Sequence, residues 1–337
     1  MVTIAELAKA LNLSTATISN ALSGKGRVSD EKKRLIISTA ARMGYDFQSI
    51  RAAEIKRNIC VLTESITSAF CTSIVEGICR SAQSCDYITT IYNLDLLREN
   101  SDNICPDKAT VAAAIQRFLA NAAPSLFGLI YVSQYPRDVS GIMPALPYPI
   151  VYAYCYAEKG SVCVNTNDQQ GAYIAVRHLI ELKRRRIAMI SGPIDSVPMI
   201  KRFYGYQRAL LDAGIATDLQ LMKAVNWDAD NSFLKMQELL ALDKVPDGVF
   251  CQNDAMAMGA IRAIQSAGLR VPEDIAVVGF DNSVIASVTA PSITSVAPPF
   301  EEIGRQSFML LQSILEKREI ANRNILLDTK LVCRTSA

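Results

Sequence analysis

The chain has 337 residues, of which 50% are hydrophobic and 20% are charged, a composition typical of globular proteins rather than of disordered or fibrous ones. This length allows one small domain together with one or two of medium size. The N-terminus lacks a basic region followed by an apolar run and a cleavage site, and no run of about 18 apolar residues occurs. We therefore expect a cytoplasmic protein that does not contact a membrane.

Basic residues are concentrated at the N-terminal end of the chain. Residues 1–57 hold ten Lys and Arg against five Asp and Glu, whereas residues 58–337 hold twenty-five against twenty-eight. A small basic module attached to a nearly neutral body is typical of nucleic-acid-binding proteins. The nine cysteines are scattered without a C-x-x-C pair, which favours reduced thiols over disulfides or a zinc site. We expect neither a metal ion nor a cofactor.

The first 45 residues have the pattern of three short helices. The first begins at a capping box, Thr3 to Glu6, and runs to about Leu11. Ser14 is the predicted N-cap of the second helix, and a third follows Ser29. The residues predicted to face inward are Ile18, Ala21 and Leu22 on the second helix and Leu35, Ile36, Ala40 and Met43 on the third.

Two short helices around a tight turn, supported by a third, describe a helix-turn-helix whose second helix enters the major groove of DNA. The outward-facing residues of that helix are polar or small, and they suit contacts with base edges and phosphates. Together with the N-cap and the basic loop that follows, the predicted DNA-binding residues are Ser14, Thr15, Ala16, Thr17, Ser19, Asn20 and Lys25. A solvated face on some other three-helix interaction module is the alternative that this pattern leaves open.

The run TIAELAKALNLSTATISNALSGKGRVSDEKKRLIISTAARMGY resembles the N-terminal signature of the lactose/galactose repressor family. The A-x-x-L/V-S-x-x-T-[IV]-S core of that signature is present as Ala10, Leu13, Ser14, Thr17, Ile18 and Ser19. The resemblance implies that Thr15, Ala16 and Asn20 read base edges. Many members have Arg where this chain has Asn20, which implies an operator with different bases at that position.

Residues 46–57 are the expected hinge between the DNA-binding helices and the rest of the chain. In the family, a leucine of this hinge wedges into the minor groove and kinks the duplex. Glu54 stands at that position here, and a carboxylate is repelled by the phosphates that line the groove. Either the neighbouring Ile55 serves as the wedge, after a shift in register, or this hinge binds DNA differently or less.

From Asn58 onward, strand-like apolar runs alternate with helical patterns in two series. The strand-like runs are NICVLT, YITTIY and FGLIYV in the first series and RIAMIS, GVFCQ and IAVVGF in the second. Repeated βα units predict parallel sheets that are covered on both faces, and two series predict two lobes with a cleft between them. We assign residues 58–160 and 292–320 to the first lobe, and residues 161–291 and 321–337 to the second.

Polar residues follow these runs, at the strand ends where open α/β sheets bind ligands. The stretches RFYGY, NWDADNSF, QNDAMAMGA and VGFDN resemble the effector domain of the same family, which shares its fold with periplasmic sugar-binding proteins. The resemblance implies that the effector is held by Phe70, Arg202, Trp227, Asn253, Asp254 and Asp281. For Asp254, capping of the following segment is an equal alternative. A guanidinium, carboxylates, an amide and one indole suit the hydroxyls and the apolar face of a sugar.

The sequence thus predicts an all-α helix-turn-helix headpiece at residues 1–45, a hinge at 46–57 and an α/β two-lobed domain with parallel sheets at 58–337. The predicted function is a repressor that binds a palindromic DNA operator as a homodimer and is released by a small sugar. A corepressor-dependent regulator with a purine-like ligand is the alternative, and a sugar-binding receptor without DNA function is a distant one. An enzyme is not expected, because His178 is the only histidine and neither a G-x-G-x-x-G nor a phosphate-loop pattern occurs.

Overall fold

The computed structural model describes residues 3–23, 57–67, 69–96, 106–122 and 126–337, together with residues 28, 29, 32, 35, 36, 39, 40 and 43. Helix α1 (Ile4–Leu11) begins at the predicted capping box. The Thr3 hydroxyl accepts from the Glu6 amide at 3.3 Å, and the Glu6 carboxylate accepts from the Thr3 amide at 2.8 Å. Helix α2 (Thr15–Ser23) begins after Ser14, whose hydroxyl accepts from the Thr17 amide at 3.1 Å and so confirms the predicted N-cap.

The headpiece has a small apolar core of its own. Its buried side chains from α1, α2 and the segment beyond are Leu7, Ala8, Ile18, Ala21, Leu22, Ile36 and Ala40. The prediction that Leu35 belongs to this core is wrong, since its side chain is 54% exposed. Ile36, Ala40 and Met43 are spaced to share one helical face. Leu35, which directly precedes Ile36, points about 100° away from that face.

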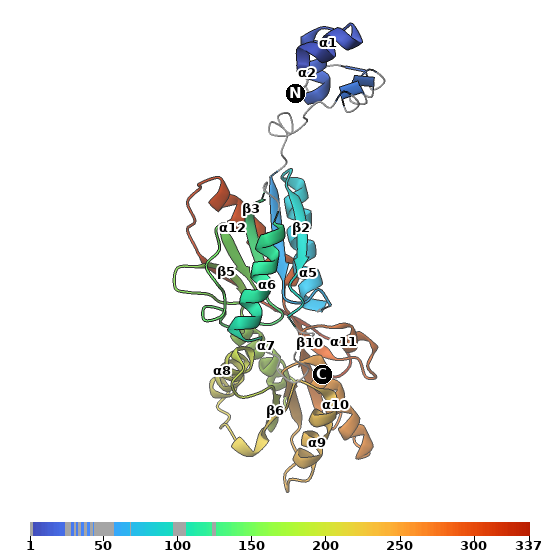
Figure 1. The fold of residues 1–337 in the computed structure, drawn as a ribbon. Helices are drawn as coiled ribbons and strands as arrows, with labels where there is room; N and C mark the ends of the chain where they lie inside the picture. The colour runs from blue at the N-terminus through green and yellow to red at the C-terminus, as the bar shows by residue number, and fades with distance from the viewer. Residues whose placement is uncertain are drawn as a thin grey trace.

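The first lobe is built on a six-stranded sheet with the order β11-β5-β4-β3-β1-β2, in which every strand pair is parallel. Its strands are β1 (Asn58–Thr63), β2 (Ile88–Asn93), β3 (Leu126–Val132), β4 (Ile150–Ala153), β5 (Val162–Thr166) and β11 (Asn324–Leu327). Helices α5 (Ala69–Ser84) and α12 (Phe300–Leu315) cover one face, and α6 (Lys108–Asn121) covers the other (Figure 1). The predicted parallel sheet between two helical layers is confirmed.

The second lobe repeats this arrangement with the strand order β12-β10-β9-β8-β6-β7. Its strands are β6 (Ile187–Ser191), β7 (Met222–Ala224), β8 (Gly248–Cys251), β9 (Ala276–Phe280), β10 (Thr294–Ala297) and β12 (Lys330–Val332). All pairs are parallel except β10 with β12. The helices of one face are α7 (Asp168–Glu181) and α8 (Val197–Asp212), and those of the other are α9 (Ala229–Leu240) and α10 (Asp254–Ser266).

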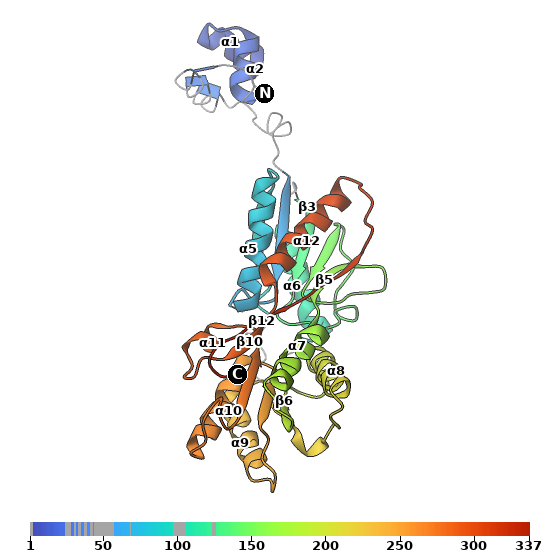
Figure 2. The same cartoon turned by 180° about the vertical axis from the view of Figure 1, so that it is seen from behind.

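The chain passes between the two sheets three times, after β5, after β10 and after β11 (Figure 2). The lobe boundaries expected at residues 161, 292 and 321 therefore need correction. Strands β5 and β11 pair within the first sheet, and β10 pairs with β9 in the second. Strands β5, β10 and β11 are short, and no neighbouring helical pattern in the sequence shows to which lobe each belongs. Hydrogen bonding to neighbouring strands, rather than composition, decides which sheet each one joins.

Candidate functional site

Arg202 of α8 lies at the carboxyl ends of the second-lobe strands and is 3% exposed. Its Nε donates to Asp168 Oδ1 at 2.8 Å, and Nη1 donates to the Gln252 carbonyl. The guanidinium carbon lies 3.6 Å from the centroid of the Phe280 ring. Two acceptors and an aromatic face therefore fix the guanidinium plane in one orientation.

Asp281 follows β9 directly and faces the same guanidinium. Arg202 Nη2 lies 3.7 Å from Asp281 Oδ1, and the Asp281 side chain is 12% exposed. Burial raises the pKa of Asp281 to about 7, with further increases from the Asp254 and Asp168 carboxylates, although Arg202 opposes the shift. The Asp281 carboxyl group pairs with Arg202 but accepts no hydrogen bond from the described residues, so its oxygens remain available to a ligand.

Tyr154 reaches the same charged groups from the first lobe, where it follows β4. Its ring packs edge-on against Phe300, with centroids 5.3 Å apart, and against Phe70, with centroids 6.3 Å apart. Burial raises the pKa of Tyr154 well above its usual value, and the Asp168 and Asp281 carboxylates raise it further. Charged groups of the second lobe therefore lie close to this first-lobe phenol.

The Tyr154 hydroxyl has no hydrogen-bond partner among the described residues, although the side chain is only 2% exposed. Two other fully buried tyrosines differ in this respect. Tyr131 donates to the Glu64 carboxylate at 2.5 Å, and Tyr206 donates to the Ile187 carbonyl at 2.8 Å. The Tyr154 oxygen is not among the solvent-inaccessible polar atoms that lack a partner, so solvent reaches it and a molecule from outside the chain is able to pair with it.

Trp227 lies against the backbone at the end of β6. A Cβ added to Gly192 would meet the indole ring at 2.1 Å, so only glycine permits this approach. The Arg202 guanidinium lies 5.9 Å from the indole centroid. Asn253 Nδ2 donates to the Trp227 carbonyl at 3.0 Å, while its Oδ1 accepts from the Met256 amide at 2.7 Å. The Asn253 amide thus positions Trp227 and caps α10.

Asp254 uses both carboxylate oxygens within the fold. Oδ2 accepts from the Ser283 amide at 2.7 Å and from its hydroxyl at 2.9 Å, and Oδ1 accepts from the Ser295 hydroxyl at 2.5 Å. The side chain is 2% exposed. The N-cap of α10 is Asn253, so Asp254 does not cap that helix; its carboxylate instead fastens the loop that carries Asp281 to β10.

Unusual backbone angles gather around these side chains. Among the described residues, nine that are not glycine have a positive φ, and four of them lie here. These four are Tyr154 (59°), Trp227 (63°), Asp281 (100°) and Asn282 (48°). Such angles are disfavoured for bulky side chains and persist where the surrounding structure imposes them, most often at binding sites.

The structure brings together three of the predicted effector residues, Arg202, Trp227 and Asp281. Phe70 lies behind Tyr154 and stacks on Phe300, with centroids 4.9 Å apart. Asp168 and Tyr154 also lie at this site, and neither is predicted as a site residue from the sequence. An acidic residue in the first turn of a helix is common for electrostatic reasons alone, so only the packed structure identifies Arg202 as the partner of Asp168.

Helix α2 carries most of the residues predicted to contact DNA. The side chains of Thr15, Ala16 and Asn20 are exposed, and those of Thr17 and Ser19 are half-buried. The Thr17 and Ser14 hydroxyl oxygens lie 2.8 Å apart. The other residues predicted to act at the DNA, Lys25 and Ile55 with its neighbour Glu54, lie outside the described residues.

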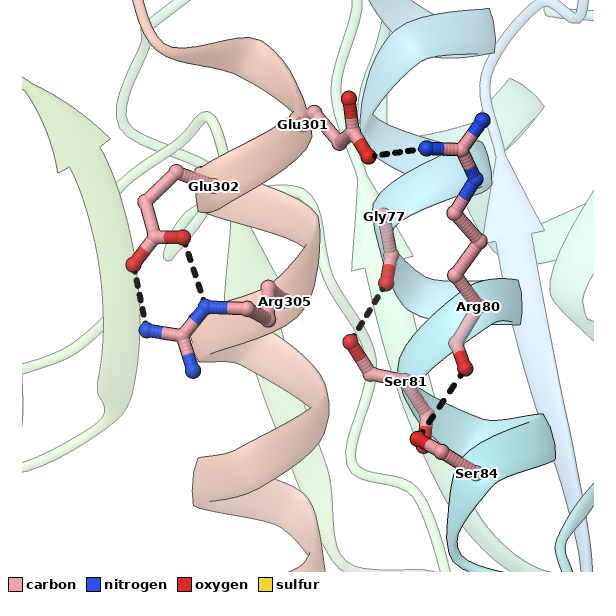
Figure 3. A pocket seen from close by; sticks show the side chains of 7 residues that line it. All are labelled: Gly77, Arg80, Ser81, Ser84, Glu301, Glu302 and Arg305. Atoms are coloured by element: carbon pink, nitrogen blue, oxygen red, sulfur yellow. Dashed lines mark hydrogen bonds and ion pairs between the residues drawn. The ribbon is translucent and has the colours of Figure 1, made fainter.

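A separate cavity of about 420 Å³ lies between α5 and α12 on the first lobe (Figure 3). Arg80 pairs with Glu301 at 2.8 Å, and Arg305 pairs with Glu302 at 2.6 Å. These charges satisfy one another, and the cavity includes none of the predicted effector residues.

Within the described ranges, we find no group of three or more His, Cys, Asp or Glu side chains that is arranged to hold a metal ion. The helices described here also include none that is both long and apolar enough to cross a membrane.

Comparison with known proteins gives matches along the whole chain. A family model described as a periplasmic binding protein-like domain matches residues 176–337. The HTH-type transcriptional repressor CytR of Escherichia coli (strain K12) is 30% identical over 339 residues, covering 99% of this chain and 96% of that protein.

Solved structures match over the same extent. The transcriptional regulator CelR in complex with cellobiose has a TM-score of 0.67 and 25% identity, and the match covers all of both chains. The Lac repressor dimer bound to operator and the anti-inducer ONPF has a TM-score of 0.75 and 24% identity, covering 99% of this chain and 98% of that one. The likeness therefore includes both the N-terminal helices and the two lobes.

Proposed function

Because this chain belongs to the lactose/galactose repressor family of transcriptional regulators, we propose that a small sugar-like effector binds between its lobes and releases the protein from its operator. The chain is a DNA-binding transcriptional repressor under the control of a ligand. The identity of the ligand, the residues that bind it and the sign of its effect form the proposal. Since its target is DNA, we place the protein in the cytoplasm.

The observation that carries the proposal is that two polar groups from opposite lobes lie close enough to influence each other electrostatically. The Tyr154 hydroxyl comes from the first lobe and the Asp281 carboxyl group from the second, and neither has a hydrogen-bond partner among the described residues. A hydroxyl of a sugar is able to donate to one and accept from the other. Arg202 offers further N–H groups beside them, and the indole of Trp227 offers an apolar face. These features support a compact, polyhydroxylated ligand.

The DNA-binding part of the proposal rests on α2. Its exposed Thr15, Ala16 and Asn20 match side chains that contact bases: Asn pairs with adenine through two hydrogen bonds, and small apolar groups contact the thymine methyl. We assign operator contacts also to Ser14, Thr17 and Ser19. The hinge contribution, with Ile55 as the wedge, belongs to this proposal as well.

We further propose that the protein acts as a homodimer on a palindromic operator, because two-fold symmetry in the protein matches two-fold symmetry in the DNA. Exposed apolar side chains in both lobes support this assembly. Val284 and Val288 on α11 (Val284–Val288) are 77% and 73% exposed. Ile88 and Ile91 on β2, the edge strand of the first sheet, are 49% and 41% exposed. Pairing of these surfaces between two copies removes apolar area from water.

Whether the ligand weakens or strengthens operator binding depends on which arrangement of the lobes it binds more tightly. An effector shifts operator affinity only if it binds the DNA-bound and free conformations with different affinities. A sugar that binds Asp281 and Tyr154 in a conformation that separates the two hinges acts as an inducer. A planar purine-like ligand, stacked on Trp227, is the second candidate and acts as a corepressor.

One experiment separates these outcomes. A palindromic operator is first selected from random DNA with the full-length protein, and its binding is then measured by fluorescence anisotropy at fixed salt, because salt alone changes DNA affinity strongly. Monosaccharides, cellobiose, nucleosides and purines are titrated one by one, with Trp227 emission recorded in parallel. We expect a sugar to change the emission and weaken operator binding. A purine that tightens operator binding, with no response to any sugar, contradicts induction.

A further inference from the structure

Lys201 of α8 crosses from the second lobe to contact Tyr156, which follows β4 in the first lobe. The Lys201 ammonium donates to the Tyr156 hydroxyl and lies 4.1 Å from the centroid of its ring. Both side chains are half-buried. Burial lowers the pKa of Lys201, although the Asp168 carboxylate opposes this shift. A cation shielded from water interacts strongly with an aromatic face, so this contact joins the lobes in one relative position.

On the first-lobe side, Tyr156 is fastened to the sheet by its backbone. Its amide donates to the Arg137 carbonyl at 2.8 Å, and its carbonyl accepts from the Val139 amide at 2.8 Å. The Arg137 guanidinium is in turn held by the Glu64 carboxylate at the end of β1, at 2.5 and 3.0 Å, and both side chains are buried. The segment to which Tyr156 bonds is therefore anchored beside β1 by a buried, bidentate ion pair.

On the second-lobe side, Lys201 directly precedes Arg202 in α8. Successive residues of a helix point about 100° apart, so one side chain reaches the first lobe while the other reaches the effector residues. Arg202 is anchored to Asp168 and to the Gln252 carbonyl. A force on Lys201 is thus transmitted through a single peptide unit of α8 to Arg202, whose guanidinium faces Asp281.

We propose that Lys201 and Tyr156 form a strut that sets the spacing of the lobes and thereby positions Arg202 for the effector. Both are positioning residues that act through Arg202. The contact between Lys201 and Tyr156 does not depend on the proposed function. Its consequence, the control of effector affinity, does rest on that function. Other polar contacts near the lobe boundary, Asn167 with Asp328 and Gln170 with Thr329, join two crossing segments to each other and place no such constraint on α8.

The test is hydrogen exchange of the full-length protein without ligand or DNA. In the K201M variant, we expect the amides of residues 154–158 in the first lobe to exchange about 5- to 30-fold faster, as expected for loss of a desolvated cation–aromatic contact. The K201R variant keeps a cation over the ring and should restore the wild-type rates. Y156F removes only the hydroxyl and should give an intermediate increase, which keeps the test valid if K201M folds poorly.

The matched control is K235M, which removes another lysine of the second lobe. Lys235 pairs with Glu238 at 2.6 Å within α9 and should leave residues 154–158 unchanged. The strut is overturned if K201M affects only α8, or if K201R exchanges as fast as K201M. Neither operator nor effector is present in this measurement, so its result does not depend on the proposed function. A failure of the proposed function would be seen in the other experiment, in which the wild-type protein would bind no selected DNA.

Discussion

Replacing Asp168 by Asn tests the buried ion pair on which the candidate effector site depends. Asn keeps the shape of the side chain but removes its charge, and it leaves Arg202 with its remaining carboxylate, Asp281, at 3.7 Å. Removing one partner of a buried pair typically costs about 3–5 kcal/mol. Because Asp281 and the Phe280 ring still stabilise the cation, we expect a loss of about 3 kcal/mol from the free energy of unfolding, at the lower end of this range.

The assay is urea unfolding followed by fluorescence of Trp227, the only tryptophan, which reports on the second lobe. The control is D230N, which removes an acid whose pair with Arg262 spans 3.3 Å and whose side chain is 91% exposed. We expect this control to lose less than about 0.5 kcal/mol, since exposed pairs contribute little. A loss for D168N no larger than that for D230N would refute the role assigned to the buried pair.

Three further predictions follow from the same site and from the headpiece. The free energy of unfolding of the D281N variant relative to the wild type should rise by about 2–3 kcal/mol between pH 5 and pH 8, because a raised folded-state pKa makes ionisation of Asp281 costly as the pH rises from about 4 to 7; an equal difference in urea unfolding at both pH values would contradict this. Replacing Gly192 by Ala should shift Trp227 emission and weaken effector binding at least about tenfold, because the indole must move away from the new methyl group; unchanged emission argues against the packing described. Replacing Ser14 by Ala should destabilise α2 by about 1 kcal/mol and weaken operator binding, as the Thr17 amide loses its acceptor; thermal unfolding of the headpiece, monitored by circular dichroism, checks this.

The alternation of strands and helices is predictable from the sequence because apolar runs and helical periodicity are local properties. NICVLT and IAVVGF correspond to β1 and β9 almost residue for residue. The lobe boundaries depend instead on pairing between distant strands. The run Val162–Thr166 is wholly buried in the first sheet, and nothing local distinguishes it from a second-lobe strand.

The candidate site likewise contains residues that are predictable from the sequence and residues that only the structure reveals. Arg202, Trp227 and Asp281 were identified because they follow predicted elements and match family stretches. Tyr154 follows β4, a four-residue strand that was not predicted, and its importance depends on an unpartnered hydroxyl that only the packed structure reveals. Asp254 was expected either to cap the following segment or to bind the effector, and its actual partners, Ser283 and Ser295, are distant in sequence.

The most direct test of the central claim is operator affinity measured by fluorescence anisotropy at fixed salt, with and without the sugar that perturbs Trp227. We expect that sugar to weaken operator binding of the wild-type protein by about 5- to 150-fold, a range typical of allosteric coupling. The D281N variant should bind the operator as the wild type does and respond little to the sugar. Operator affinity that is unchanged by the sugar in the wild type, or a D281N variant that responds fully, would contradict control of DNA binding through a ligand at Asp281.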